Sequence, residues 1–344
     1  MREKNKGDKK VSIVEVAKLA GVSPATAARV FDKKWDGKVR ESTREQVMRA
    51  ASALGYRGPN ALARSIQGGP SGIVALVVGS TTGYFYAEVI MKFVRKLQAT
   101  HKQVLIFEAD PQQGLAKVVT QICCYQVDAI IVTAAATTSA IIEQFCDTNI
   151  PVVAFNRQAT PGICSAVYCD GSKAAAQAAE FMLNQGLRSF LVISGETNLS
   201  KELGRVKGFC NRVLQEGGRI VDVVDGDYLY ESGYKLFSQQ ESIRNIGGVF
   251  CVEDTIAMGV IDAAKEKFHL RVPEDLSVMG FDNTSVGRFH AYSLTTMAYP
   301  INEMIDATIE VVEAMIQDAS LHIQREFDMR LVQRGSVRLL PACD

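Results

Sequence analysis

Residues 12–31, SIVEVAKLAGVSPATAARVF, form the first stretch of the chain with a clear hydrophobic pattern. Ser12 with Glu15 three residues later is a capping box, which predicts that a helix begins there. Gly21 then supplies the left-handed backbone conformation that a sharp turn between helices needs. The apolar residues that repeat on one face of this helix are Ile13, Val16, Ala17 and Ala20. The pattern predicts a short amphipathic helix that ends in a tight turn.

Two more helices are predicted directly after it. Ser23 followed by Pro24 is a helix-start signal, because serine caps well and proline suits the first helical position. A third helix is predicted from about Ser42 to Leu54, with Gly55 as its stop. This order is typical of a helix-turn-helix, whose second helix enters the major groove of DNA. An ordinary helical hairpin has the same local pattern.

From Ile73 onward, short apolar runs alternate with amphipathic segments. Continuous apolar runs between helices favour parallel sheets that are covered on both faces. The predicted strands are 73–78, 103–109, 128–134, 151–155, 190–194, 220–224, 248–252 and 276–280. The predicted helices lie near 85–100, 114–125, 138–147, 172–186, 200–216, 231–240 and 254–267. Two such series predict two α/β subdomains, with a ligand cleft where the carboxyl ends of their strands face each other.

Charge is distributed unevenly along the chain. The formal net charge of the 344 residues is zero, yet residues 1–66 contain 15 Lys and Arg against 7 Asp and Glu. The first part therefore has a net charge of +8 and the remainder −8. A basic N-terminal part on an acidic body suits a polyanionic partner at one end only.

Composition excludes several classes of protein. No segment approaches the roughly 20 apolar residues of a membrane span, and the charged N-terminus lacks the apolar stretch of a secretory signal. We therefore expect a cytoplasmic protein with no membrane partner. The eight cysteines form no C-x-x-C pair, so we expect small buried thiols. Four scattered histidines predict no metal site, and no cofactor is expected.

The chain resembles the LacI/GalR family of transcription regulators from about residue 12 to residue 340. Five motifs carry the resemblance, in this order: VAKLAGVSPATAARVF, TREQVMRAASALGYR, NALARSI, VPEDLSVMGFDN and LTTMAYP. The resemblance implies a small all-α helix-turn-helix DNA-binding domain plus an α/β two-subdomain core like that of periplasmic binding proteins. It also implies a homodimer that binds a pseudopalindromic double-stranded operator under the control of a small-molecule effector.

The resemblance also implies domain boundaries. We expect residues 1–10 to be disordered, 11–58 to form the helix-turn-helix domain, and 59–71 to form a hinge helix and linker. The core spans 72–340. Its first subdomain is expected to comprise about 72–168 with 299–324, and its second 169–298 with 325–340.

DNA contacts are implied at positions that match the family's motifs. These are Ser23, Pro24, Ala25, Thr26 and Arg29 in the recognition helix, and Asn60, Ala63, Arg64 and Ile66 in the hinge helix. Ile66 takes the place of a leucine that wedges into the minor groove. Ala27 and Ala28 depart from the family, which usually has an aliphatic residue and then a phosphate-binding serine. Alternatively, Arg29 is a solvated surface residue that does not contact DNA, and the hinge segment is a plain linker helix.

Effector contacts are implied at the cleft. They are Tyr84, Phe85, Tyr86, Asn156, Arg157, Arg205, Tyr228, Asp254 and Asp282. Tyr299 replaces a frequent glutamine, and several residues that grip hexoses in relatives are missing. An anionic or aromatic effector is therefore as compatible with the sequence as a neutral sugar. Alternatively, these residues do not bind an effector: the loop carboxylates are simply solvated, and the aromatic residues simply fill the core.

Two other functions predict features that the sequence lacks. A solute-binding protein of periplasmic type, the alternative function, would have a secretion signal and no basic N-terminal part. A nucleotide-dependent α/β enzyme would have a glycine-rich fingerprint after its first strand. Residues 79–84 read GSTTGY instead, so we expect no enzymatic activity.

Overall fold

The computed structural model describes residues 11–31, 35–56, 58, 70–79, 83–109, 115–133, 139–195, 204–241 and 243–340. The chain divides into two compact units, Met1–Ser71 and Gly72–Asp344. The predicted hinge helix, with Asn60, Ala63, Arg64 and Ile66, lies outside the described residues.

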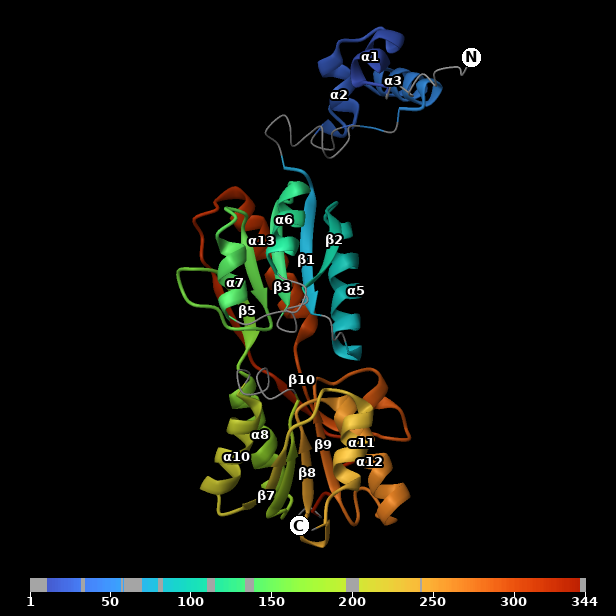
Figure 1. Cartoon of the computed structure of the whole chain (residues 1–344). Helices are drawn as coiled ribbons and strands as arrows, with labels where there is room; N and C mark the ends of the chain where they lie inside the picture. The colour runs from blue at the N-terminus through green and yellow to red at the C-terminus, as the bar shows by residue number, and fades with distance from the viewer. Residues whose placement is uncertain are drawn as a thin grey trace, which may run out of the picture. The chain divides into compact units, whose positions relative to one another are not determined.

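The first unit contains three helices, α1 (Ile13–Ala20), α2 (Pro24–Phe31) and α3 (Glu41–Leu54) (Figure 1). The predicted capping box is confirmed, since the Ser12 side chain accepts from the Glu15 backbone and the Glu15 side chain accepts from the Ser12 backbone. Gly21 ends α1 with φ 65°, in the left-handed region. Local sequence signals therefore set both ends of α1.

A small apolar core holds these three helices together. Val16 of α1, Ala27 of α2 and Val47 of α3 have no exposed surface. Because Ala27 is fully enclosed, its short side chain sits where the helices approach each other. This unit is the helical domain that the pattern of residues 12–54 predicts.

The second unit is built on two six-stranded sheets. The first sheet has the order β11-β5-β4-β3-β1-β2, and all of its strands are parallel. Its strands are β1 (Ile73–Gly79), β2 (Gln103–Ala109), β3 (Ala129–Thr133), β4 (Val152–Phe155), β5 (Ser165–Cys169) and β11 (Gln324–Phe327). Its helices are α5 (Tyr84–Ala99), α6 (Leu115–Cys124), α7 (Ser139–Cys146) and α13 (Ile301–Gln317). We call this set the first subdomain.

The second sheet has the order β12-β10-β9-β8-β6-β7, and its edge strand β12 is antiparallel to β10. Its strands are β6 (Ser189–Ile193), β7 (Arg219–Val224), β8 (Gly248–Cys251), β9 (Ser277–Phe281), β10 (Thr295–Ala298) and β12 (Arg330–Val332). Its helices are α8 (Gly171–Asn184), α10 (Arg205–Gln215), α11 (Tyr230–Ser238) and α12 (Asp254–Phe268), with short 3₁₀ turns at Ile243–Asn245 and Val286–Arg288. We call this set the second subdomain.

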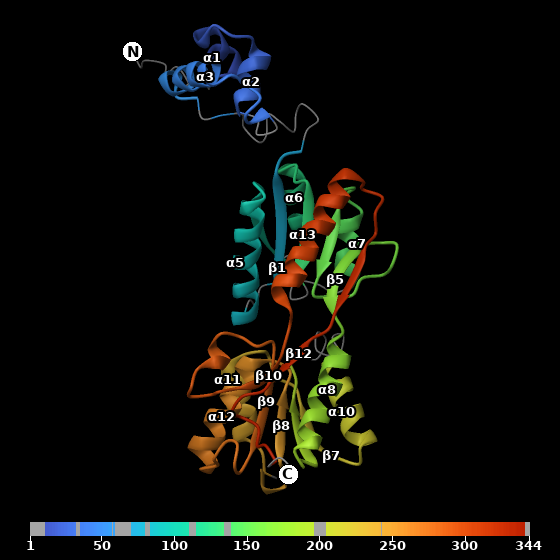
Figure 2. The same ribbon diagram turned by 180° about the vertical axis from the view of Figure 1, so that it is seen from behind.

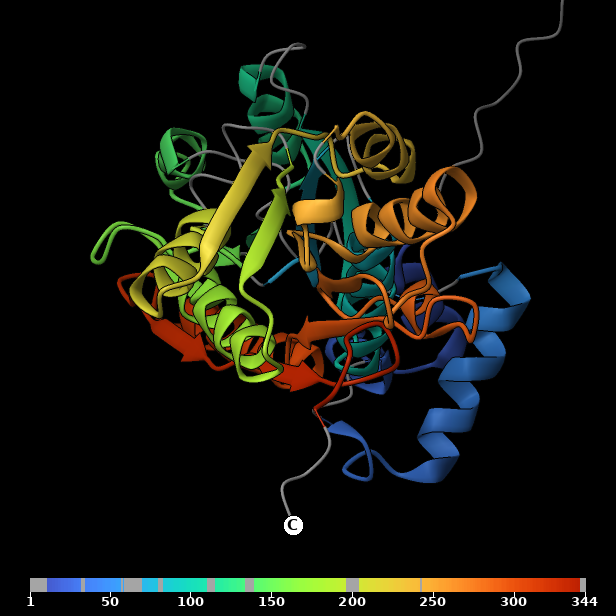
Figure 3. The ribbon, with the colours of Figure 1, turned by 90° about the horizontal axis from the view of Figure 1, so that it is seen from below.

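Helices cover both faces of each sheet. Neighbouring residues of β1 point to opposite faces, so Leu76 packs with α5 and α13 while Val77 packs with α6 and α7. Figures 1 and 2 show α13 on one side of the first sheet and α6 and α7 on the other. Figure 3 shows the α8–α10 pair and the α11–α12 pair on opposite sides of the second sheet. The predicted fold class is confirmed.

The chain crosses between the subdomains where three pairs of elements meet. Asp170 joins β5 to α8, Tyr299 and Pro300 join β10 to α13, and Asp328 with Met329 joins β11 to β12. The crossings at Tyr299 and Asp328 bring segments far apart in sequence to the boundary between the two sheets. These crossings are the covalent connections between the two subdomains.

Several elements were not anticipated from the pattern. Strands β5, β10, β11 and β12 are short and include polar residues, so they lack the continuous apolar runs of the other strands. Helix α13, which has one buried face, was not among the predicted helices. The expectation of uniformly buried thiols is wrong for Cys123 and Cys124, which are exposed at the end of α6. No helix in the described part of the chain is both long and apolar enough to span a bilayer.

Candidate functional site

The exposed face of α2 has few polar groups. Pro24, Ala25, Ala28 and Arg29 are exposed, whereas Ala27 and Val30 are buried on the opposite face. Residues 25, 28 and 29 therefore share one surface, as their i, i+3 and i+4 spacing requires. Arg29 is the single charged residue of α2.

Ser23 and Thr26 are hydrogen-bonded to each other at the start of α2. The Ser23 hydroxyl accepts from the Thr26 backbone N–H at 3.1 Å, and the two hydroxyl oxygens are 2.8 Å apart. Ser23 therefore caps the helix as predicted. Both side chains lie near the exposed N-terminal end of α2, where a helix favours an anion such as phosphate.

A second cluster surrounds Arg205 at the boundary between the subdomains. Arg205 begins α10, and its Nη1 donates to the carbonyl of Val252 at 2.6 Å while its Nη2 donates to the hydroxyl of Tyr299 at 2.6 Å. Nη2 also lies 3.3 Å from Oδ1 of Asp282, and the guanidinium lies 4.2 Å from the ring centre of Phe281. A buried arginine needs these hydrogen bonds and the nearby carboxylate, because burying an unpaired charge costs roughly several kcal/mol.

Two residues of the first subdomain face this cluster. Asn156 follows β4, and its side chain lies near the hydroxyls of Tyr86 and Tyr299, where it acts to lower the pKa of both. Burial raises the pKa of Tyr86 to about 12, although Asn156 acts in the opposite direction. Burial likewise raises the pKa of Tyr299. Both tyrosines therefore stay neutral near pH 7 and offer hydroxyl groups rather than charges.

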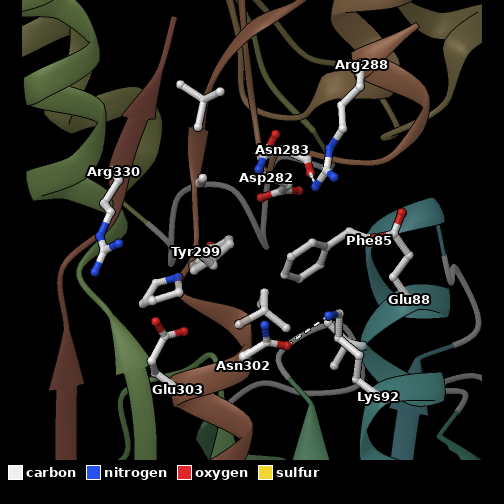
Figure 4. Close-up of a pocket in the computed structure, with 15 residues that line it drawn as sticks. Phe85, Glu88, Lys92, Asp282, Asn283, Arg288, Tyr299, Asn302, Glu303 and Arg330 are labelled. Carbon is white, nitrogen blue, oxygen red and sulfur yellow. Dashed lines mark hydrogen bonds between the residues drawn. The ribbon is translucent and has the colours of Figure 1, made fainter.

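Tyr299 separates two pockets. One pocket of about 650 Å³ is bounded by Asn156 and Arg157, by the start of α8 and by Arg205. The other, of about 300 Å³, lies between α5 and the residues around Tyr299 (Figure 4). There the rings of Phe85 and Tyr299 are 5.2 Å apart, and Lys92 donates to Asn302 at 2.9 Å. A ligand in the larger pocket would touch both subdomains.

Asp254 is fully buried and bonded within the second subdomain. Its Oδ2 accepts from the backbone N–H of Thr284 at 2.6 Å and from the Thr284 hydroxyl at 3.0 Å, while Oδ1 accepts from the Thr296 hydroxyl at 2.6 Å. Burial raises the pKa of Asp254 to about 7. Asp254 thus ties the loops after β9 to the start of α12, and it lines neither pocket.

The remaining predicted effector residues are spread around the boundary. Arg157 is buried and lines the larger pocket. The Tyr228 ring lies directly against Gly195, with Tyr228 held in the left-handed region at φ 64°. Tyr84 is exposed, in contrast to the buried Phe85 beside it. The structure therefore gathers Tyr86, Asn156, Arg205 and Asp282 around Tyr299, while Tyr84 and Asp254 stand apart from that group.

Glu253 was missed by sequence reasoning. Its carboxylate caps α12 by accepting from the backbone N–H groups of Thr255 and Ile256 at 2.5 and 3.2 Å. Burial, together with the charges of Asp282 and Asp254, raises the pKa of Glu253 well above its ordinary value. The signal in the sequence was an adjacent acidic pair directly after an apolar strand. Nowhere in the described ranges do three His, Cys, Asp or Glu side chains converge as a metal site would require.

Comparison with known proteins identifies the family of this chain. The family model for bacterial regulatory proteins of the lacI family matches residues 12–60, and the model for a periplasmic binding protein-like domain matches residues 179–337. Catabolite control protein A of Priestia megaterium is 30% identical over 306 residues, which cover 86% of this chain and 89% of that protein. The chain belongs to the LacI family.

Other members of the LacI family agree with this assignment. The transcriptional repressor PurR of Erwinia tasmaniensis is 31% identical over 299 residues, covering 84% of this chain and 85% of that protein. Among solved structures, the lac repressor dimer bound to operator and the anti-inducer ONPF has a TM-score of 0.82 at 19% identity, over 95% of this chain and 99% of the other. The complex of the regulator CelR with cellobiose has a TM-score of 0.69 at 23% identity and the same coverage. These two likenesses concern the fold.

Proposed function

We propose that this LacI-family protein is a sequence-specific transcription regulator, a repressor, whose affinity for its operator is controlled by a small-molecule effector. The observation that carries the proposal is the cluster of Arg205 with Tyr299 at a crossing between the subdomains. Tyr86 and Asn156 reach it from the first subdomain, and Asp282 reaches it from the second. A ligand bound there would exchange contacts with both subdomains and so favour one relative orientation of them.

The DNA-binding role is assigned to the first unit. Ser23, Pro24, Ala25, Thr26 and Arg29 lie on or beside the exposed part of α2, and the hinge residues Asn60, Ala63, Arg64 and Ile66 are proposed from the sequence alone. We propose the domain limits in the same way, with a helix-turn-helix domain at 11–58, a hinge at 59–71 and a core at 72–340. Relatives named as repressors and the lac repressor dimer bound to operator support this assignment.

Regulation follows from two states of the core. An effector that binds one relative orientation of the subdomains more tightly shifts the population toward it. In a homodimer, that shift changes the spacing of the paired N-terminal domains and hence their fit to a two-fold symmetric operator. We propose such a dimer in the cytoplasm, with no enzymatic activity of its own.

The effector class follows from the chemistry of the larger pocket. Arg205 is already neutralised by Asp282 and hydrogen-bonded to Tyr299, so it offers less charge to a ligand than the sequence suggested. Arg157 lines this pocket together with Tyr168 and Tyr299, which makes it a polar site with flat aromatic faces. We propose a sugar, a sugar acid or a nucleoside-like molecule. CelR, described in complex with cellobiose, is a relative in fold that accommodates a sugar.

Two experiments test the proposed function. Selection of the full-length protein on random DNA duplexes should recover a pseudopalindrome, and binding to it should weaken steeply as salt increases. A thermal-shift panel of neutral sugars, sugar acids and nucleosides should identify ligands that raise the melting temperature and change operator affinity. Failure to enrich any sequence would reject the regulator, and ligand-induced stabilisation without DNA binding would favour a solute-binding protein.

A further inference from the structure

Trp35 lies against the guanidinium of Arg29. The central carbon of that guanidinium is 4.5 Å from the centre of the Trp35 ring, and the Nζ of Lys38 is 5.7 Å from it. Both distances are within the range of a cation–π contact. Trp35 is the single tryptophan of the chain and is half-buried, whereas Arg29 and Lys38 are exposed.

A short turn fixes the position of the indole. The backbone N–H of Lys38 donates to the carbonyl of Trp35 at 3.0 Å, and Gly37 permits the turn with φ 73°. Asp36 accepts a hydrogen bond from Nη1 of Arg44 at 2.7 Å, which ties the turn to α3. The backbone turn and the ion pair of Asp36 therefore fix the segment that carries the indole.

Arg29 supplies most of the hydrogen-bonding capacity on the exposed face of α2. The other exposed residues of its face, Ala25 and Ala28, carry only methyl groups, and Pro24 has no donor. The Thr26 and Ser23 hydroxyls are already bonded to each other. Hydrogen bonds or ion pairs between the side chains of this helix and DNA therefore depend mainly on the orientation of Arg29.

We propose that Trp35 is a positioning residue that holds Arg29 in the orientation used to contact DNA; this rests on the proposed function. Stacking covers one face of the guanidinium and leaves its N–H groups free at the edge of the plane. That edge can donate to a guanine or to a phosphate. Because the side chain is ordered before binding, less rotamer entropy is lost when the contact forms.

A double-mutant cycle on the full-length protein tests this role. Operator affinity is measured at one salt concentration for the parent protein, Trp35→Ala, Arg29→Ala and the double variant. An exposed cation–π contact corresponds to about a two- to fivefold change in affinity, and two half-sites raise this to about four- to 25-fold per dimer. Trp35→Ala should weaken binding by this amount in the parent and have little effect once Arg29 is alanine. Trp35→Phe should restore part of the loss.

Two controls separate positioning from other roles. Lys18→Ala, at an exposed lysine of α1 outside the Trp35–Arg29 contact, should show no coupling to Arg29. Thermal unfolding should exclude variants that do not fold, and Trp35→Phe provides a folded comparison. An equal effect of Trp35→Ala in both backgrounds, or no effect in either, would overturn the proposal. If the parent protein binds no operator at all, the proposed function itself fails.

The single tryptophan adds an independent measurement. Replacing Arg29 by alanine should change the emission of Trp35 in the free protein, because a charge stacked on the indole is removed. Replacing Arg49, an exposed arginine on α3 with no contact to Trp35 given by the structure, should leave the emission unchanged. Identical spectra for the parent and Arg29→Ala would contradict the stacked arrangement.

Discussion

Nη2 of Arg205 donates a hydrogen bond to the hydroxyl of Tyr299 at 2.6 Å. Arg205 begins a helix of the second subdomain, and Tyr299 is the first residue of a crossing to the first subdomain. Because both side chains are buried, the bond ties the arginine to the segment that must bend when the subdomains rotate. It therefore couples the stability of the core to the geometry of the proposed effector cleft.

Removing the Tyr299 hydroxyl should destabilise the core. In Tyr299→Phe, a buried arginine N–H loses its acceptor, which costs about 1–3 kcal/mol of unfolding free energy. Tyr292→Phe is the matched control, since Tyr292 donates to Asp262, which also accepts from Tyr230. Denaturant unfolding should give a clearly larger loss for Tyr299→Phe than for the control. Equal losses would mean that the bond to Arg205 adds nothing specific.

A methyl group at Gly195 should displace the Tyr228 ring. A Cβ at Gly195 would lie 2.1 Å from the end of that ring, which is a flexible side chain and can move. Gly195→Ala should therefore leave stability nearly intact but weaken effector binding by about two- to tenfold, the value of one stacked aromatic contact. Gly247→Ala, where the nearest atom is 3.5 Å away, is the control. Calorimetric titration with the effector found in the thermal-shift panel measures both, and unchanged affinity in Gly195→Ala would remove Tyr228 from the site.

Because of the raised pKa of Asp254, the unfolding free energy of the protein should decrease as the pH rises. Its pKa is raised by burial from 3.8 to about 7, so the folded protein binds the proton more tightly than the unfolded chain. The associated stability is complete below about pH 4 and is lost as the pH rises toward about 7. In Asp254→Asn, the unfolding free energy should fall less over this range. Urea unfolding at several pH values measures the difference, and parallel curves would contradict the raised pKa.

Other carboxyl groups do not reverse this comparison. Burial also raises the pKa of Asp282 and of Glu253, which adds dependence of the same sign. The bond to Arg271 lowers the pKa of Asp275, so its contribution is lost as the pH falls below about 4. Removing the Asp254 charge also makes the pKa of Glu253 less raised, so the difference between parent and Asp254→Asn reports Asp254 together with this coupling, which has the same sign.

Restoring a hydroxyl at residue 28 should strengthen operator binding. The resemblance to the family implies a phosphate-binding serine at this position, and Ala28 is exposed beside Arg29. One added hydrogen bond per half-site corresponds to about a two- to tenfold gain in affinity for Ala28→Ser. Ala53→Ser, an exposed alanine on α3 of the same domain, should have no effect. A gain in both variants, or in neither, would remove residue 28 from the DNA-facing surface.

Local order was readable from the sequence because it depends on neighbouring residues. The capping box at Ser12, the turn at Gly21 and the stop at Gly55 each involve groups within a few residues, and each is present as expected. The apolar runs of the eight predicted strands coincide with observed strands. Burial on both faces explains the continuous hydrophobic signature of the inner strands, whereas the edge strands β2 and β7 are partly exposed. Strand β12 left no such signature, because it is a three-residue edge strand in which Arg330 and Leu331 are exposed.

Only the tertiary structure decided which polar residues meet. Arg205 and Tyr299 are 94 residues apart, and no periodicity links them. The sequence placed Asp254 in the cleft on the basis of its family position, whereas the fold surrounds it with hydrogen bonds from Thr284 and Thr296. Chain-local patterns fix helices, turns and strands because those form between near neighbours. Partners of buried charges are set by how distant strands pack, and that packing places Tyr299 at the centre of the proposed site.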